Sequence, residues 1–141
     1  MTDTISSTGN TSADHPIDNP FLEFMGVRLV QWSEGYAEMH LPMRDELGNR
    51  TARVHGGVLC SLLDSVCGYC GLWAPPGDPE LRSLTLSLTT QFMDARAGQT
   101  LIAKGYMQRR GKTIFFSRAE VWMDDEHLLA TAVGTFKYIR R

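Results

Sequence analysis

The sequence predicts a single α+β domain in which an antiparallel sheet of about six strands wraps round one long central helix. Two observations predict this arrangement. The stretch from Val54 to Trp73 is apolar on nearly every side, which is typical of a helix enclosed by the rest of a domain. Strand-like runs lie on both sides of it in the sequence, and short turns separate them.

The first ordered elements are a short helix and a hairpin. Asn19 and Pro20 predict a helix cap and first turn, and Gly26 predicts the end of that helix. The run 27–43 alternates in polarity and breaks at 33–35, which predicts a hairpin of two strands. A polar connection then leads to the central helix.

The central helix is expected from Gly56 to about Leu72, where the prolines of "APPGDPE" prevent its continuation. Four strands are expected after it, in "SLTLSLTTQFM", "TLIAKGYMQRR", "TIFFSRAEVWM" and "LLATAVGTFKYI". In the first of these strands, Leu84, Leu86 and Leu88 are expected on the face opposite to Thr85.

Small residues recur on single faces of two of these strands. They are Ala103 and Gly105 on one strand, and Ala130, Ala132 and Gly134 on the last. In register, such residues make a shallow trough, which is what a sheet needs in order to wrap a helix.

Composition places the chain among ordinary soluble domains. It has 141 residues, a net charge of −2, 43% hydrophobic residues and 21% charged residues. The charge gives no sign of nucleic-acid binding, and no apolar run of about 18 residues indicates a membrane span. Residues 1–18 lack the features of a secretory signal, and their Ser, Thr, Asp and Gly content predicts a disordered tail before a domain at 19–141.

The three cysteines, Cys60, Cys67 and Cys70, all lie in the helical stretch. An odd number without an export signal fits a reducing cytoplasm, which is the expected location. Cys67 and Cys70 have C-x-x-C spacing, but a redox or zinc role would need a second ligand pair or a thioredoxin-like setting. We therefore expect small buried thiols and no metal site.

Asp64 is the only acid in the helical stretch. A buried, unpaired carboxylate is costly, so Asp64 is expected either to be paired or to face a cleft or a subunit boundary. The helix face that carries Asp64 has small or polar residues. They are spaced three or four residues apart and are Gly57, Cys60, Ser61 and Gly68. The other large side chains of the helix can serve the core.

The start of the helix is unusual. His55, Gly56 and Gly57 precede or open it, and no Ser, Thr or Asp is placed to cap it. Free backbone N–H groups at a helix start attract negative charge, and glycines let a substrate approach them closely. This arrangement suits a polarised carbonyl oxygen.

These residues carry a resemblance. His-Gly-Gly, followed by an acid nine residues after the His, resembles the hotdog-fold acyl-CoA thioesterases of the phenylacetate-degradation (PaaI-like) type. Asn49, six residues before His55, and the runs "TLSLTTQFMDARAGQTLIAKG", "RRGKTIFFSRAEVW" and "LLATAVGTF" extend the likeness from about Pro20 to Tyr138. It implies a hotdog fold that hydrolyses acyl-CoA to a free acid and coenzyme A, with no cofactor beyond the coenzyme A of the substrate.

The resemblance also implies roles for five residues. Gly57 would offer its N–H to the thioester carbonyl, and Asp64 would be the nucleophile or the general base that activates water. Asn49 would help to hold the thioester or the water, and His55 would support the loop and the carbonyl. Thr85 aligns with a position where a hydroxyl orients the water.

Other residues are expected to bind the substrate. Gly56 would let it approach the backbone, and Arg109, Arg110 and Lys112 surround a glycine at a predicted turn, where they either receive coenzyme A phosphates or form a solvated turn. Trp73 follows the helix and either lines the acyl pocket or belongs to the core or an interface. The acyl group, aromatic or fatty, stays open.

Helix geometry predicts a composite site. Gly57 and Asp64 are seven residues apart, or roughly 10 Å along one axis, whereas a reacting group must lie about 3 Å from both. Two antiparallel helices from two subunits satisfy this requirement. We therefore expect a homodimer, which agrees with the usual dimer of the family, and a dimer of dimers is a further option.

Two other functions compete with hydrolysis. A hotdog module could bind an acyl or aromatic ligand without catalysis, and a hotdog hydratase or dehydratase would use an Asp–His pair in a different loop context. A serine hydrolase is disfavoured, because neither Ser61 nor Ser65 has a histidine within an obvious relay.

Overall fold

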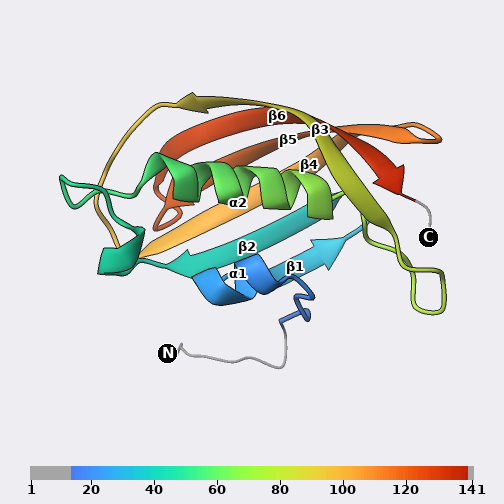
Figure 1. Ribbon diagram of the computed structural model, residues 1–141, viewed down its shortest axis with the longest axis horizontal. Coiled ribbons are helices and arrows are strands. Elements are labelled where there is room, and N and C mark those ends of the chain that lie inside the picture. Colours follow the sequence, from blue (N-terminus) through green and yellow to red (C-terminus); the bar gives the residue numbers. More distant parts are fainter. Residues whose placement is uncertain (1–13, 140–141) are drawn as a thin grey trace.

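Figure 1 shows the computed structural model of the chain, which describes residues 14–139. The short helix α1 (Pro20–Met25) precedes strands β1 (Arg28–Ser33) and β2 (Tyr36–Pro42). A 3-10 turn (Asp45–Leu47) leads to the long helix α2 (Gly56–Tyr69). The remaining strands are β3 (Arg82–Phe92), β4 (Thr100–Arg110), β5 (Ile114–Met123) and β6 (His127–Ile139).

The six strands form one antiparallel sheet in the order β1-β2-β4-β5-β6-β3. Figure 1 shows that this sheet curves round α2, with β3 crossing the helix on the side away from β1. The predicted α+β arrangement, a sheet wrapped round one central helix, is confirmed. β1 and β3 are the two edges of the sheet.

Small residues on the concave face of the sheet let α2 approach closely. A Cβ atom on Gly105 would overlap the backbone carbonyl of Val66 in the helix. In the register of β4 with β5, Gly105 pairs with Ala119 and Ala103 pairs with Val121, so the small surface continues across two strands. The predicted trough is confirmed at this contact.

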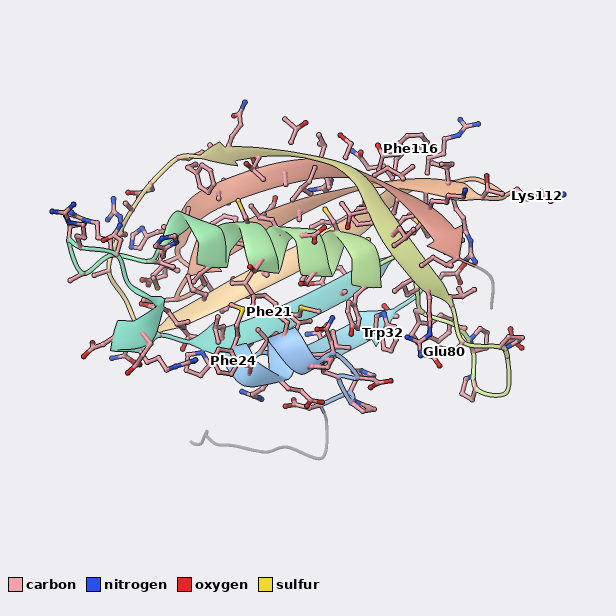
Figure 2. The ribbon with its side chains drawn as sticks, in the orientation of Figure 1. Phe21, Phe24, Trp32, Glu80, Lys112 and Phe116 are labelled. Atoms are coloured by element: carbon pink, nitrogen blue, oxygen red, sulfur yellow. The ribbon has the colours of Figure 1, made fainter. Side chains whose placement is uncertain are left out.

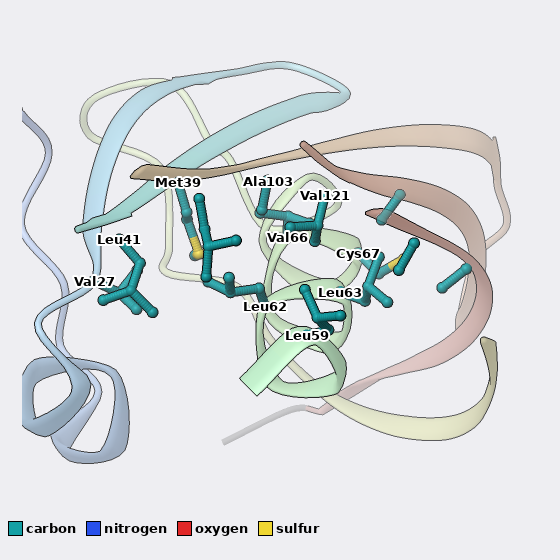
Figure 3. Close-up of a cluster of buried hydrophobic side chains, with 14 of the residues drawn as sticks. Val27, Met39, Leu41, Leu59, Leu62, Leu63, Val66, Cys67, Ala103 and Val121 are labelled. Atoms are coloured by element: carbon teal, nitrogen blue, oxygen red, sulfur yellow. The ribbon is translucent and has the colours of Figure 1, made fainter. Parts of the chain in front are cut away.

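The hydrophobic core fills the space between α2 and the concave face (Figure 3). The helix contributes Leu59, Leu62, Leu63, Val66 and Cys67, and the sheet contributes Met39, Leu41, Leu101, Phe115, Val121 and Phe136, all of them buried. Every large apolar side chain expected to serve the core from α2 does so. The helix face that carries Asp64 therefore stays outside the core.

Helix α2 ends three residues earlier than expected, at Tyr69 instead of Leu72. The backbone tightens here, because the N–H groups of Gly71 and Leu72 donate to carbonyls only three residues back. The ring of Phe115 lies against Gly71 and leaves no room for a side chain. No helix within residues 14–139 is long and apolar enough to cross a membrane.

The expected boundary between tail and domain, at residue 18, stays a prediction. Residues 1–13 of that tail lie outside the described residues, but residues 14–18 are bound to the domain. The N–H of His15 donates to the carbonyl of Leu29 over 2.8 Å. Arg28 Nε donates to Asp14 Oδ2 over 2.7 Å.

Candidate active site

Asp64 lies in the middle of α2 and is joined to the edge strand β3. Thr85 Oγ1 on β3 donates a hydrogen bond of 2.8 Å to Asp64 Oδ1. Over residues 14–139, no Lys, Arg or His pairs with Asp64, and its second oxygen accepts no hydrogen bond. A neutral hydroxyl thus holds the carboxylate on one side and leaves the other oxygen available for chemistry.

A bulge in β3 directly after Thr85 changes which of the later residues face the helix. Thr85 and Ser87, two residues apart, pair with adjacent residues of β6, so Leu86 is an extra residue. The extra residue reverses the alternation beyond it, and Leu88 faces the helix as Thr85 does. The expectation that Leu84, Leu86 and Leu88 share one face is therefore wrong.

A groove of about 300 Å³ opens beside this pair, and we call it the Asp64 groove. Its walls are Cys60, Ser61, Asp64, Thr85 and Leu88. Ser61 Oγ donates to the carbonyl of Gly57 over 2.8 Å, and Ser65 Oγ donates to the carbonyl of Ser61 over 2.7 Å. Both hydroxyls are engaged by helix carbonyls, which agrees with the expectation that neither serine is a nucleophile.

A larger cavity of about 590 Å³ begins at the same pair and follows the C-terminal half of α2. We call it the acyl cavity. Trp32, Leu72 and Phe136 give it apolar walls, and the segment 74–78 lines it beyond the end of the helix. A Cβ on Gly68 would lie 3.4 Å from the Phe136 ring, so this glycine leaves space between α2 and β6. The walls are mixed, because Asp18, Asp78, Glu80 and Arg82 line the cavity beside the apolar side chains, and Asp64 lines both this cavity and the Asp64 groove.

Trp32 is a lining residue that sequence reasoning missed. Its Nε1 donates to the carbonyl of Tyr69 over 2.7 Å, and the two rings pack with centroids 5.5 Å apart. Trp73, the expected lining residue, does not line the acyl cavity. The contact joins β1 to the end of α2, and no local sequence signal indicates it.

His55 caps the start of α2, so the expectation of an uncapped helix is wrong. Its Nδ1 accepts a hydrogen bond of 2.8 Å from the Gly57 N–H. Its backbone carbonyl accepts from Val58 and Leu59 over 3.0 and 3.3 Å. The Gly57 N–H can reach a substrate carbonyl only when the imidazole turns aside or shares this donor.

Asn49 organises the loop that precedes α2. Its Oδ1 accepts from the Thr51 N–H over 2.9 Å, from Thr51 Oγ1 over 2.8 Å and from the Arg53 N–H over 3.2 Å. It lines neither the Asp64 groove nor the acyl cavity. Within one chain, Asn49 therefore lies in the same loop as His55 and away from Asp64.

The five expected catalytic residues thus form two groups in one chain. Asp64 and Thr85 meet at the middle of α2, whereas Asn49, His55 and Gly57 lie at its start. Seven residues of helix separate Gly57 from Asp64, which is roughly 10 Å along the axis. Gly56 lies with the second group, because it opens the helix.

The expected basic turn at 109–112 lies at the other end of α2. The Arg110 guanidinium stacks on the ring of Tyr138, 5.2 Å from its centroid, and the Tyr138 hydroxyl donates to the carbonyl of Gly71 over 2.7 Å. Gly71 follows the end of the helix. Figure 2 shows the tip of this hairpin, with Lys112 labelled, projecting from the domain.

Two of the three cysteines are buried behind the site. Cys67 and Cys70 carry free thiols, and Cys70 Sγ donates to the carbonyl of Cys67 over 3.1 Å. Burial raises the pKa of Cys67 to about 11 and that of Cys70 to about 12. These are the properties of packed thiols, as expected, because a catalytic or metal-binding cysteine has a lowered pKa.

Comparison with known protein families gives a match over the helix and most of the sheet. The family model of the thioesterase superfamily matches residues 52–130, more than half of the chain. A protein of Saccharolobus solfataricus, named as a candidate esterase, is 24% identical over 118 residues, which cover 84% of this chain and 82% of that protein.

Solved structures share the architecture. A conserved protein of Pseudomonas aeruginosa matches with a TM-score of 0.76 and 28% identity, over 86% of this chain and 94% of that one. The PaaI protein of E. coli, from the phenylacetic acid degradation operon, matches with a TM-score of 0.74 and 22% identity, over 87% of this chain and 86% of that one. The second likeness concerns the fold alone, which is the expected hotdog arrangement of six strands and one long helix.

Proposed function

The chain belongs to the thioesterase superfamily, and from that membership we propose that it hydrolyses acyl-CoA thioesters to a free acid and coenzyme A. The observation that carries the proposal is the Asp64–Thr85 pair, a carboxylate without a cationic partner in residues 14–139, which lines both the Asp64 groove and the acyl cavity. Within the superfamily, we place the chain on the PaaI-like branch because of its His-Gly-Gly and Asp64 spacing.

The proposed reaction uses only groups of the chain and water. The Gly57 N–H polarises the thioester carbonyl once His55 releases it. Asp64 either takes a proton from water, which attacks the carbonyl carbon, or attacks that carbon itself to give an anhydride that water then opens. In both routes the carbon–sulfur bond breaks, the oxygen of water ends in the acid, and coenzyme A leaves as its thiol.

Thr85 acts on this reaction through its hydrogen bond to Asp64. By occupying Oδ1, it orients the carboxylate so that Oδ2 faces the reacting water or carbonyl. Asn49 and His55 keep the backbone before Gly57 in place, through the loop hydrogen bonds and the helix cap. The acyl cavity accommodates an aromatic ring or a fatty chain between Trp32 and Phe136.

The proposed site is shared by two subunits. Gly57 and Asp64 of one helix lie too far apart to act on one carbonyl, whereas two antiparallel copies of α2 bring Gly57 of one chain to Asp64 of the other. The edge strand β3 supports this proposal. It is eleven residues long and exposes Leu84, Leu86 and Phe92 by more than half, and such an edge is normally covered.

Release of coenzyme A thiol tests the function. The wild type and the Asp64→Asn variant are assayed on a panel of aryl-acyl and fatty acyl-CoA substrates, with Asp45→Asn as a control at an exposed acid outside the site. We expect the wild type and the control to hydrolyse at least one substrate, and Asp64→Asn to lose most of this activity while it stays folded. Full activity in Asp64→Asn would discard the mechanism.

The same panel separates the competing functions. Acyl-CoA binding in calorimetry without any thiol release would identify a binding module. Conversion of an enoyl-CoA to its hydrated form, with the thioester intact, would identify a hydratase.

A further inference from the structure

A second open cavity, of about 590 Å³, lies beyond the start of α2. One wall is the loop Thr51–Arg53, and the other is the turn Asp94–Ala97 that follows β3. We call it the arginine groove, because Arg53 and Arg96 stand on opposite walls. It shares no lining residue with the acyl cavity or the Asp64 groove.

Both walls lie near the glycines at the start of α2, one through the chain and the other through a side-chain contact. Arg53 precedes Gly57 by four residues, which limits their separation to about 14 Å even for extended chain. On the other wall, the Phe92 ring lies 3.8 Å from the position of a Cβ on Gly56, and Asp94 follows Phe92 by two residues. The arginine groove therefore opens on the side of the domain where α2 begins, and the donor proposed for the thioester carbonyl lies at that end of the helix.

The walls of the arginine groove carry two guanidinium groups and one carboxylate. Arg96 Nε donates to Asp94 Oδ2 over 3.0 Å, and this hydrogen bond is the main cause that lowers the pKa of Asp94. In the part of the chain that the structure describes, the terminal nitrogens of Arg96 donate to no residue. The carboxylate thus fixes one edge of the guanidinium and leaves the fork free, which is the geometry that binds phosphate in a bidentate manner.

The backbone that carries Arg53 is held in place. The Arg53 N–H donates to Asn49 Oδ1, its carbonyl accepts from the Asn49 N–H over 2.6 Å, and Ala52 between them has a left-handed φ of 62°. The side chain of Arg53 is exposed and pairs with no acid among residues 14–139. Because the backbone of Arg53 is already held, binding of an anion would need to order only its side chain.

We propose that the arginine groove binds the phosphate groups of coenzyme A, with Arg53 and Arg96 as the contacting residues. This inference rests on the proposed function and adds the place where the anionic part of the substrate binds. A thioester carbonyl at Gly57 puts the flexible pantetheine arm at the mouth of the groove. The basic turn at 109–112 of the same chain is a less direct candidate, because the 14 residues of α2, about 21 Å, separate it from Gly57. An antiparallel partner helix would bring the partner's own turn nearer, and the turn variant below tests that alternative.

Kinetics on substrates with and without phosphates test the proposal. Arg53→Gln, Arg96→Gln and the double variant are compared on the best acyl-CoA and on the same acyl group carried by pantetheine, which has no phosphate. Arg118→Gln, on the outer face of the sheet, is the matched control. A variant with Arg109, Arg110 and Lys112 all changed to Gln tests the basic turn.

We expect each groove variant to raise KM for acyl-CoA by about ten- to a hundredfold, as for loss of a charge-assisted hydrogen bond. Values of kcat/KM on the pantetheine thioester should not change. Inhibition by coenzyme A should weaken in the same variants. Dephospho-coenzyme A and inorganic phosphate, used as further inhibitors, distinguish the 3′-phosphate, the pyrophosphate and a site for any small anion.

Three results would overturn the proposal. They are an unchanged KM for acyl-CoA in the double variant, an equal loss on both substrates, and a larger effect of the turn variant than of the groove variants. The proposed function is judged separately. If no thioester is hydrolysed, calorimetry with coenzyme A still shows whether its affinity depends on Arg53 and Arg96.

Discussion

Thr85 donates a 2.8 Å hydrogen bond to Asp64 and so links the edge strand β3 to the middle of α2. Thr85 faces the helix immediately before the extra residue of β3, at the position where the helix carries its only acid. The two oxygens of Asp64 therefore differ. One accepts the hydrogen bond from Thr85, and the other accepts none from residues 14–139.

Replacement of Thr85 tests whether this bond orients the carboxylate. Thr85→Val keeps the shape and removes the hydroxyl, and we expect kcat to fall about ten- to a hundredfold, since hydrogen bonds to charged groups contribute roughly 1.5–3 kcal/mol. Thr85→Ser keeps the donor and should retain most activity. Steady-state kinetics on one acyl-CoA measures both, and equal activity in the two variants would contradict the role.

Gly105 should tolerate no side chain. In Gly105→Ala the new methyl meets the backbone carbonyl of Val66, which cannot rotate away, so we expect a loss of about 3 kcal/mol in the free energy of unfolding. Gly56→Ala is the control, because its methyl meets only the Phe92 ring at 3.8 Å, and it should change stability by no more than about 1 kcal/mol. Urea unfolding gives both values, and equal stabilities would show that α2 does not pack on this strand as described.

Glu38 should make stability depend on pH. It accepts hydrogen bonds of 2.7 Å from Tyr36 and His40 on the outer face of β2. The His40 bond is the largest cause that lowers the pKa of Glu38; partial burial opposes it, while Tyr36 and, to a smaller extent, Lys104 add to the lowering. Because the folded pKa is below the unfolded one, near 4.3, ionised Glu38 stabilises the fold above that pH. The contribution is lost as pH falls through the folded pKa.

Glu38→Gln removes this contribution. At pH 7 the variant should be less stable than the wild type by about 1 kcal/mol, as for one charged hydrogen bond in a partly exposed site. The difference should shrink as the pH falls below about 4.3 and through the lowered pKa of Glu38, where the carboxyl becomes protonated in the wild type as well. Urea unfolding at a series of pH values from 7 into the acid range measures the difference, and a difference that does not shrink at any acid pH where the protein stays folded would refute the assignment.

The cysteines should differ in reactivity. Cys67 and Cys70 are buried with raised pKa values, whereas Cys60 lines the Asp64 groove. We expect iodoacetamide at pH 8 to label Cys60 faster than Cys67 and Cys70, which should react only after denaturation. Mass spectrometry of tryptic peptides resolves the three sites. Equal labelling rates in the native protein would mean that the helix is not packed as described.

The sequence predicted the layers of the fold because those depend on side-chain size. A glycine and alanines on one face of a strand leave a trough whatever the loops do, and Gly105 against Val66 shows that the helix fills it. The apolar face of α2 and the isolated acid at Asp64 follow from helix periodicity alone. Both could be inferred before any contact was known.

Other features could not be inferred, because they depend on single-residue register or on distant contacts. The bulge at Leu86 leaves no mark in a run of alternating Leu, Ser and Thr, so the expected faces of β3 were wrong beyond it. The cap on α2 comes from His55, a residue type with little preference for that position. Trp32 reaches the acyl cavity from a strand that is distant in sequence.

Mixing two inactive variants tests the shared site most directly. Asp64→Asn lacks the carboxylate, and Gly57→Pro lacks the N–H while keeping a backbone angle that the first turn of a helix allows. Each variant alone should fold as a dimer, checked by sedimentation, and should hydrolyse little acyl-CoA. After subunit exchange, half of the dimers are mixed, and each has one intact site.

The account predicts that the mixture regains about a quarter of wild-type activity, because one site in two is intact in one dimer in two. If the mixed dimers form and the mixture stays as inactive as its parents, the carbonyl donor and the acid act within one chain, and the shared site is wrong.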